Sequence, residues 1–591
     1  MIQETRHNSS RQELLFIYLL CPLLLSGCLT APFLPYDDFI HVSFPVVLGT
    51  EPWYAAFSLD ALAAQSATYF PVTLLSYRAE HFIACDVCNV RNWAPLVRLD
   101  NLAIHMLTGL FLWLICESFA LKRISRVFVT AAFLLHPMAC ESVCWVSERK
   151  NLLAGVFGFA AIVVLLRCKD YRWRVIWANL LYTLALFGKP SALGLLPVIL
   201  VLEIWHYLGG KTEIPNVRSE GWWPLLGCVG FILIAMFDLA LSLVAGNRVL
   251  MPLPGGSHYT AILTDFEILQ RYLENLLVPA HLSVFYFVKP IISFTEVRCL
   301  LSVLFLVIVF SVSVLFSERR GLCIFFWFWF ISALGPVLNL FGFPYLMQDR
   351  YAYLSAPAIF IVVSLALEGL AARFIKHEHL DSLRLQRLGL ACVGIISIGY
   401  ALTAASRSVL WENTYVLFQD AVRKQPKSAI AQVYMGTTLA KIADWDEEHH
   451  NERSPESDRV KAVQHLETAC MLDDFVRLIR PGQPYAALAY VELKLGKLDE
   501  AERAARRCLA GKFHIPVDNL TLMEMHVRLA EILFARQRFD EAVAEADSAL
   551  NIIKNSQDAY LIKSRALDSL NRPDEAAAAR RQGGIRVPPA H

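Results

Sequence analysis

Long apolar segments recur along the first 410 residues, and they constrain this chain more than any other feature of its sequence. Leu14 to Leu34 gives 21 residues without a charge, enough to cross a hydrocarbon core of about 30 Å at about 1.5 Å per residue. Ten further segments lie near residues 99–120, 127–145, 151–167, 175–188, 190–208, 223–245, 297–316, 321–341, 351–371 and 388–407. The pattern predicts an all-α membrane bundle of about eleven spans.

Composition supports a membrane protein and narrows its partners. Hydrophobic residues make up 56% of the 591 residues, and the mean hydropathy is +0.45, too apolar for an ordinary soluble chain. A net charge of +1 favours no nucleic-acid partner. The 14 cysteines are scattered and indicate no disulfide framework. Cys85 and Cys88 form a lone C-x-x-C, which favours a local disulfide or two free thiols over a metal site.

The sequence Leu25-Ser26-Gly27-Cys28 offers a second interpretation of the N-terminal segment. It fits the cleavage site of a bacterial lipoprotein, in which case the preceding apolar run is a signal peptide. Glu13 and Pro22 fit that pattern poorly, and the apolar run continues past Cys28. We therefore favour a membrane span.

The basic residues of the loops predict the orientation of the chain. With a cytoplasmic N-terminus, fifteen Lys and Arg residues fall in five cytoplasmic loops, near 122–126, 167–174, 211–218, 319–320 and 373–387. The opposite loops hold nine. Cytoplasmic loops carry the excess of Lys and Arg in membrane proteins. The odd number of spans then places residues after 410 outside the cytoplasm.

Two long loops fall on the predicted outer face, at 35–97 and 246–296. The first begins with Asp37 and Asp38, directly after the first span. Adjacent carboxylates repel, so one of them is expected to hold its proton more tightly than a free Asp. This suits a general base at the water boundary, although the pair could equally solvate a helix end. In the second loop, 266–277 has apolar residues at helical spacing, as in a helix that lies in the interface.

Charged residues also gather at the outer ends of the predicted spans. The anions are Glu141 and Glu148, and the cations are Arg149, Lys150, Lys189 and Arg350. Any one of them could be an ordinary helix-end anchor, but charges at membrane depth are costly and are functional candidates by default. Four cations together would suit a lipid-linked phosphate.

The composition changes near Leu410, where Ala, Glu, Arg and Asp become abundant. Three short motifs recur: Leu498-Asp499-Glu500-Ala501, Phe539-Asp540-Glu541-Ala542 and Pro573-Asp574-Glu575-Ala576. The last two are 34 residues apart, the period of tetratricopeptide (TPR) repeats. The first two are 41 apart, which an insertion around His514 to Asp518 explains. A degenerate unit is expected over 426–472, and His449-His450 in its acidic insert is read as solvated loop rather than metal site. The repeats predict a concave surface that binds a peptide or protein.

Motifs along nearly the whole chain carry a family resemblance. They are Tyr36-Asp37-Asp38, Asn101 with His105, the run from His136-Pro137 through Glu141, Val143 and Trp145 to Arg149-Lys150, Lys189-Pro190, Asp349-Arg350-Tyr351 with Tyr353-Leu354, and the segment from Trp411 to Pro426. The chain resembles the transmembrane and TPR-repeat O-mannosyltransferases, especially their bacterial relatives, within the C-type (GT-C) glycosyltransferases.

The resemblance implies a GT-C-like membrane domain over 1–409 and a TPR domain over 410–591, in a bacterial inner membrane. It implies transfer of a sugar, mannose or similar, from a polyprenyl-phosphate donor to a protein or glycan acceptor on the outer face. The repeats would dock the acceptor. No resident cofactor follows from it, and a need for a divalent metal stays open.

The resemblance also implies roles for particular residues. Asp37 or Asp38 would be the base, and their identical chemistry leaves the choice open, with a slight preference for Asp37. The donor phosphate and substrate would meet His105, His136, Glu141, Arg149, Lys150, Lys189, Asp349, Arg350 and Tyr351.

Four positions depart from the family pattern and leave other functions open. Phe70 stands where Arg is expected, Ala139 replaces His, Asn151 replaces Asp, and Ser355 replaces Pro. A catalytically silent membrane scaffold that presents its repeats is one alternative. A ligase or polymerase of lipid-linked glycans is another, and it would not need the acid of the first loop.

Overall fold

The computed structural model describes residues 12–58, 69–207, 223–246, 252–340, 342, 345–378, 382–450, 454–472, 482–511, 517 and 519–585. Throughout these residues the secondary structure is helical, with no strand, which confirms the all-α prediction. The chain forms two compact units. Unit 1 comprises 1–284 and 290–417, and unit 2 comprises 285–289 and 418–591.

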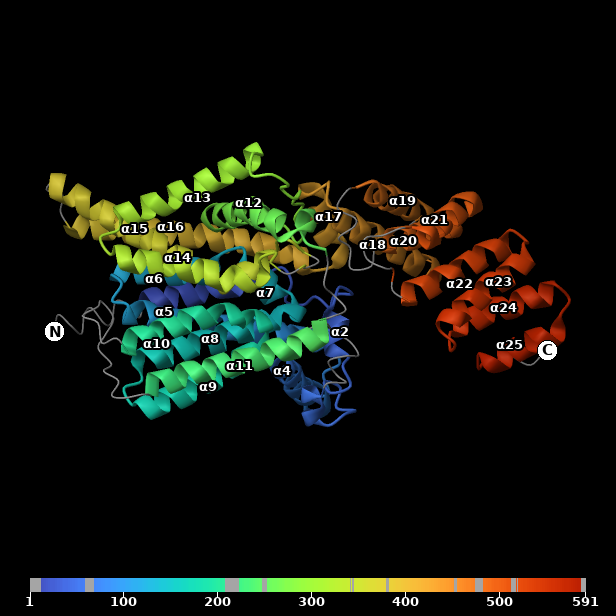
Figure 1. The fold of residues 1–591 in the computed structure, drawn as a ribbon, viewed down its shortest axis with the longest axis horizontal. Coiled ribbons are helices and arrows are strands. Elements are labelled where there is room, and N and C mark those ends of the chain that lie inside the picture. The colour runs from blue at the N-terminus through green and yellow to red at the C-terminus, as the bar shows by residue number, and fades with distance from the viewer. Residues whose placement is uncertain are drawn as a thin grey trace. The chain divides into compact units, whose positions relative to one another are not determined.

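The long helices of unit 1 run side by side in a bundle (Figure 1). They are α5 (Ala94–Ser118), α6 (Arg123–Leu135), α8 (Arg149–Arg167), α9 (Tyr171–Gly188), α10 (Leu196–Tyr207), α11 (Trp223–Gly246), α12 (His258–Leu277), α13 (Val297–Phe316), α14 (Arg320–Leu334), α15 (Ala356–Glu378) and α16 (Ser382–Ser408).

Six helices of the described residues are long and apolar enough to cross a membrane. They are Ala94–Ser118, Val146–Arg167, Val297–Phe316, Arg320–Val337, Ala356–Arg373 and Gln386–Trp411. Three shorter apolar helices, Gln12–Leu25, Pro190–Trp205 and Leu226–Leu241, lie at three more of the predicted spans. The two remaining predicted spans fall on α6 and α9. The protein is an integral membrane protein.

Two predicted spans are shorter as helices than as apolar runs. The N-terminal helix ends at Leu25, and turns and extended chain follow to Leu34. The segment 127–145 is divided at His136 because Pro137 lacks a backbone N–H and disfavours a helical residue before it. His136 accordingly has ψ 132°, and the short helix α7 (Ala139–Cys144) follows.

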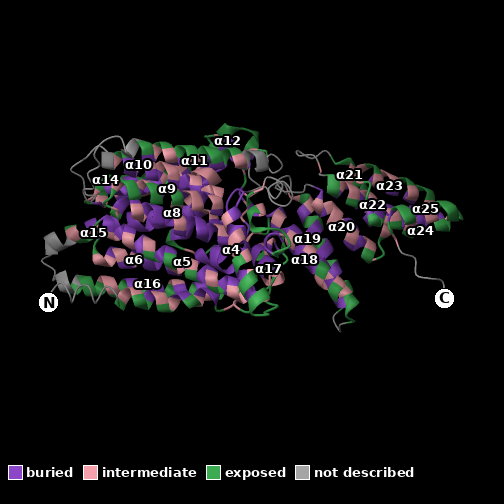
Figure 2. Ribbon diagram, turned by 90° about the horizontal axis from the view of Figure 1, so that it is seen from below, coloured by how far each residue is buried: buried purple, intermediate pink, exposed green. Residues whose placement is uncertain are grey.

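Helix α8 lies at the centre of the bundle and α13 at its edge. In the span Val146–Arg167, which contains α8, 83% of the most apolar stretch is buried, whereas 17% of the corresponding stretch of α13 is buried. Figure 2 shows buried positions concentrated along α8. Two glycines allow close packing, since a Cβ on Gly155 would lie 2.6 Å from the Tyr353 ring and one on Gly158 2.5 Å from Leu195. The exposed face of α13 carries Leu and Ile side chains suited to lipid.

Unit 2 contains consecutive helix pairs (Figure 1). Its helices are α18 (Ala429–Glu448), α19 (Pro455–Met471), α20 (Gln483–Lys494), α21 (Leu498–Ala510), α22 (Asn519–Ala535), α23 (Phe539–Ile552), α24 (Gln557–Ser569) and α25 (Pro573–Gln582), and α17 (Thr414–Lys424) crosses into it from unit 1. The three predicted repeat motifs begin α21, α23 and α25. Two residues before each lies a positive-φ residue: Gly496, Gln537 and Asn571.

These equivalent turns confirm the TPR-like repeat, because a left-handed residue at the same register reverses the chain in each pair. The small side chains of Ala489, Ala501 and Ala504 are buried in the core of this unit. The predicted insertion over 514–518 falls, except for Val517, outside the described residues.

Candidate active site

The first outer loop is held against the bundle by backbone and ring contacts. The Arg98 guanidinium of α5 donates hydrogen bonds to the carbonyls of Ala31 and Pro32. The Tyr36 ring stacks on the Trp145 ring with centroids 4.7 Å apart, and the Trp145 indole N–H donates to the Tyr36 carbonyl over 3.3 Å. This packing fixes the chain on both sides of the acidic pair.

Asp38 is fully buried, so the prediction that both acids lie at the water boundary is wrong for this residue. One carboxylate oxygen accepts from the Leu34 backbone N–H over 2.8 Å. The other accepts from the Ser147 N–H and hydroxyl over 3.1 and 2.8 Å. Burial raises the pKa of Asp38 to about 6, against these hydrogen bonds, which favour the ionised form. Asp38 therefore joins the loop to the segment before α8.

Asp37 differs from its neighbour in conformation and in surroundings. It has φ 60° and ψ −20°, and it is half-buried. Within the described part of the chain, no hydrogen bond or ion pair engages its carboxylate. Burial raises the pKa of Asp37, while the charges of Lys150 and Arg350 act to lower it. Asp37 is thus an acid that interacts electrostatically with these two cations while its carboxylate keeps no hydrogen-bond partner among the described residues.

Those cations surround one buried carboxylate, that of Glu148. The Lys189 ammonium lies 3.0 Å from it, the Lys150 ammonium 3.5 Å, and the Arg350 Nε 3.3 Å. The side chains of Lys150, Lys189 and Arg350 are 18%, 13% and 7% exposed, whereas the Glu148 side chain is 2% exposed. The cations therefore separate the carboxylate from solvent, and we call these four residues the Glu148 cluster.

Breaks in three helices bring the Glu148 cluster together. Glu148 ends the short helix η4 (Val146–Glu148), directly before α8. Lys189 lies between α9 and η5 (Pro190–Leu195), where Pro190 interrupts the apolar run. Burial lowers the pKa of Lys189 to about 8, although Glu148 favours its charged form. Arg350 lies in η8 (Asp349–Ala352), before α15.

Glu141 and Asn151 hold Arg350 in place from α7 and α8. The Glu141 carboxylate accepts from the Arg350 guanidinium over 2.5 Å and from its backbone N–H over 2.9 Å. The Asn151 amide donates to the Arg350 carbonyl over 3.0 Å and accepts from the Lys189 ammonium over 2.7 Å. Tyr351 lies beside this arrangement, with its ring 5.3 Å from the Arg350 guanidinium.

Arg149 differs from the other predicted cations in the residues that it contacts. Its guanidinium is buried and paired with Glu80 over 2.6 Å. It also donates to the Asn101 side chain over 2.8 Å and to the Val97 carbonyl over 2.9 Å. All three guanidinium nitrogens are engaged, so a phosphate could reach Arg149 only by displacing these partners. The sequence grouped it with the cluster because it stands next to Lys150.

Both predicted histidines have engaged ring nitrogens. His105 contacts the Tyr353 hydroxyl over 2.8 Å and the Leu134 carbonyl over 3.2 Å. His136 accepts from the Met138 N–H and donates to the Leu276 carbonyl, each over 3.2 Å. Both rings are therefore held by partners within the protein.

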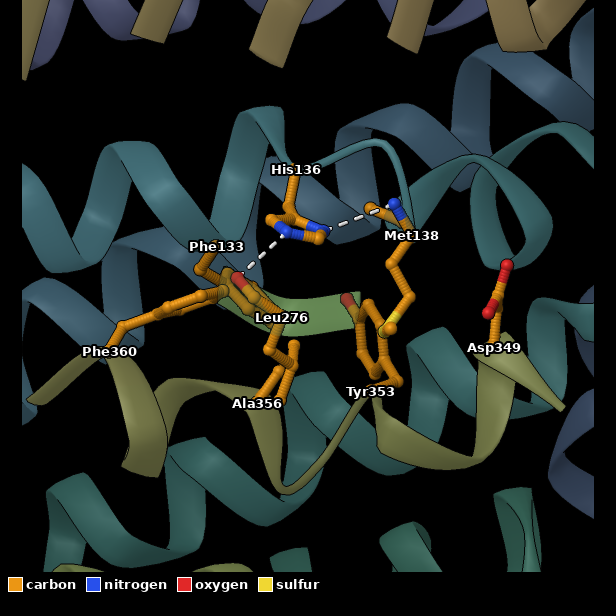
Figure 3. Close-up of a pocket in the computed structure, with 9 residues that line it drawn as sticks. Phe133, His136, Met138, Leu276, Asp349, Tyr353, Ala356 and Phe360 are labelled. Atoms are coloured by element: carbon orange, nitrogen blue, oxygen red, sulfur yellow. Dashed lines mark hydrogen bonds between the residues drawn. The ribbon is translucent and has the colours of Figure 1, made fainter. Parts of the chain in front are cut away.

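A small cavity lies beside His136, as Figure 3 shows. Its volume is about 20 Å³, room for about one water. Ala139, one of the departures from the family pattern, lines it together with Asp349. The Asp349 carboxylate lies 3.3 Å from the Arg407 guanidinium, which places this predicted site residue in an ion pair.

Two of the other departures, Phe70 and Asn151, contact cations of the cluster. The Phe70 ring lies 5.9 Å from the Lys150 ammonium and 5.2 Å from the His41 ring. Asn151 contacts Lys189 as an amide, so the cluster lacks the negative charge that an Asp would add. The Ser355 hydroxyl donates to the Ala352 carbonyl over 3.1 Å.

Sequence reasoning counted Glu148 among the outer-end charges but assigned it no binding role, and it left His41 out. Glu148 had a signal, because it directly precedes Arg149 and Lys150. His41 had a weaker one: it is four residues after Asp37, the spacing that brings side chains to neighbouring positions on a helix. Among the described residues, no group of three or more His, Cys, Asp or Glu side chains could hold a metal ion.

No protein-family model matches the chain. Two curated relatives do, the protein O-mannosyl-transferase TMTC3 of Mus musculus and that of Homo sapiens. Each is 21% identical over 87% of this chain. The chain resembles the TMTC O-mannosyl-transferases. The relatives confirm the resemblance predicted from the motifs, and the match covers 56% of their length, so this chain spans about half of each.

Two solved structures show weaker likeness. One is the Archaeoglobus fulgidus oligosaccharyltransferase tethered with an acceptor peptide, with 12% identity, a TM-score of 0.35 and coverage of 74% of this chain and 58% of that one. The other is the APC/C hetero-tetramer Cut9–Hcn1, with 14% identity, a TM-score of 0.23 and coverage of 83% and 86%. At such TM-scores neither carries an argument about this chain.

Proposed function

We propose that this protein is a membrane glycosyltransferase that moves a sugar from a polyprenyl-phosphate donor to a hydroxyl of a protein or glycan acceptor on the extracytoplasmic face. The observation that carries the proposal is the electrostatic interaction between Asp37 and the Glu148 cluster. Within the described residues, the Asp37 carboxylate has no hydrogen-bond partner, and it interacts with Lys150 and Arg350, cations of a cluster that is partly exposed. A base and a phosphate-binding group are the two parts that such a transfer needs.

In the proposed reaction, the Asp37 carboxylate takes the proton from the acceptor hydroxyl. The acceptor oxygen forms a bond to the anomeric carbon while the bond from that carbon to the phosphate oxygen breaks, with inversion. The charge that develops on the lipid phosphate is stabilised by Lys150, Lys189 and Arg350. Glu148 holds these cations together, and Glu141 orients Arg350.

Asp38 serves this site without taking the proton. Its two oxygens accept three hydrogen bonds, so it has no oxygen directed to a substrate. The bonds to Ser147 join the loop of Asp37 to the residue before Glu148. Of the two acids, Asp37 is therefore our choice for the base.

The test is transfer by purified protein in proteoliposomes that contain polyprenyl-phosphate-mannose and candidate acceptor proteins, with products identified by mass spectrometry. Asp37→Asn should lower the rate by about 10²–10⁴, the usual contribution of a positioned base. The exposed Asp86 of the same loop provides the control, and Asp86→Asn should leave the rate unchanged.

Three other results would redirect the assignment. Transfer by Asp37→Asn at the unmodified rate would exclude Asp37 as base. Transfer of a whole lipid-linked glycan by that variant would favour a ligase or polymerase. An unmodified protein that binds no donor and leaves membrane glycans unchanged when deleted would favour a scaffold built on the TPR-like unit.

A further inference from the structure

His41 lies beside the proposed base and has no role so far. It belongs to the short helix α2 (Asp38–Val42) and is buried, with 5% of its surface exposed. Its Nδ1 lies 2.9 Å from the backbone carbonyl oxygen of Asp37. A carbonyl oxygen only accepts hydrogen bonds, so Nδ1 carries the hydrogen and Nε2 carries the lone pair.

The bond falls on a residue of this loop whose backbone is strained. Among the non-glycine residues described between 12 and 58, only Asp37 has a positive φ, 60°. Side chains with a Cβ rarely adopt this conformation, and it persists where the surroundings fix it. The His41 ring fixes the carbonyl of Asp37, and the Asp38 carboxylate fixes the chain directly after it.

The His41 ring is itself held in place and neutral. It packs against the Phe70 ring at 5.2 Å, and it interacts electrostatically with Lys150 and Glu148. Burial, with the Lys150 charge, lowers the pKa of His41 to about 3, so the ring carries no charge at neutral pH. It therefore acts through one hydrogen bond and its packing rather than through charge.

We propose that His41 is a positioning residue that, through its Nδ1–H, holds Asp37 in the left-handed conformation in which its carboxylate interacts with the charges of the Glu148 cluster. The inference rests on the proposed function only in calling Asp37 the base. The positioning itself is a property of the unliganded protein.

Two substitutions separate the hydrogen bond from the bulk of the ring. In His41→Asn the amide nitrogen takes the place of Nδ1, because the same three bonds join it to Cα. In His41→Gln the amide nitrogen takes the place of Nε2 instead. If Nδ1 positions Asp37, the His41→Asn variant should retain the local structure. The His41→Gln variant and a third variant, His41→Ala, should lose it.

The first readout is hydrogen exchange of peptides that span residues 34–43, measured by mass spectrometry on protein without donor or acceptor. We expect at least tenfold faster exchange in His41→Gln and His41→Ala, and exchange within threefold of the unmodified protein in His41→Asn. The exposed His258 of α12 supplies the control, His258→Asn. Equal exchange in Asn and Gln variants would overturn the positioning role. The melting temperature of each variant is also measured, and only variants with similar melting temperatures are compared.

The second readout is the transfer assay. His41→Gln should lower kcat at least tenfold with donor KM within threefold, and His41→Asn should restore most of kcat. A loss of kcat in Asn equal to that in Gln would also overturn the proposal. If the unmodified protein transfers no sugar, the proposed function fails, and the exchange experiment still decides the role of His41.

Discussion

The Glu148 carboxylate accepts a hydrogen bond from the Lys189 ammonium over 3.0 Å, and it is the shared partner of two more cations. The chain brings them together from α8, the break after α9 and the segment before α15. One carboxylate thus holds cations from parts of the chain that are about 40 and 200 residues apart. These ion pairs hold the residues of the site together before any substrate binds.

Replacement of Glu148 should therefore affect stability as well as activity. Glu148→Gln keeps the shape of the side chain but leaves Lys150, Lys189 and Arg350 to repel one another. Loss of one partner of a buried ion pair typically costs about 3–5 kcal/mol. We expect a clear drop in melting temperature in nanodiscs, followed by intrinsic fluorescence. Glu51→Gln, at an exposed position of the first loop, is the control, and an unchanged melting temperature in Glu148→Gln would contradict the role of Glu148.

Arg149 and Lys150 are adjacent in sequence, and the structure predicts opposite phenotypes for them. Arg149→Gln breaks a buried pair with Glu80, so it should lower the melting temperature while the folded fraction binds donor normally. Lys150→Gln removes a partly exposed cation, so it should weaken donor binding by about tenfold, roughly 1.4 kcal/mol, with little loss of stability. Titration with a polyprenyl phosphate, read by native mass spectrometry, measures the binding. The reverse pattern would place the phosphate at Arg149.

This contrast marks how far the sequence could predict the site. Periodicity and apolar length predicted the bundle and the repeats, because those depend on each segment alone. The sequence could not predict that Arg149 and Lys150, which are adjacent, have different partners. Only the packing of α4 (Pro71–His81) and α5 decides which of the two cations pairs with Glu80. The distinction between Asp37 and Asp38 likewise depends on Ser147, more than a hundred residues later. Whether the assigned residues act as proposed stays a prediction.

The pH dependence of transfer should report the charge around Asp37. A base works when deprotonated, so the rate is present above the pKa of Asp37 and is lost as pH falls through it. Burial raises this pKa above the ordinary 3.8, and Lys150 opposes the rise. Removal of that cation in Lys150→Gln should therefore move the acid limb of kcat to higher pH. The exposed Lys169 gives the control, Lys169→Gln, and a limb that moves to lower pH would contradict the assignment.

The C-terminal end of unit 1 should tolerate truncation only after Trp411. The Trp411 ring is 1% exposed and stacks on Trp145 at 5.6 Å. Trp→Ala in a core typically costs about 3–5 kcal/mol. Trp411→Ala should thus lower the melting temperature, whereas Trp53→Ala, at a ring that is 59% exposed, should not. A chain that ends at Arg407 should be unstable for the same reason, and equal melting temperatures in the two Trp variants would contradict this account.

The orientation in the membrane gives the last prediction. The excess of basic residues in alternate loops predicts a cytoplasmic N-terminus and an extracytoplasmic TPR-like unit. Single cysteines at Lys169 and at Glu500, both exposed, test this on a background without reactive cysteines. With an impermeant maleimide on intact cells, Glu500→Cys should be labelled and Lys169→Cys should stay protected until the membrane is opened. Because the first outer loop and the cluster are predicted on the same side as Glu500, the reverse labelling would place the candidate site in the cytoplasm. It would remove the extracytoplasmic acceptor from the proposed reaction.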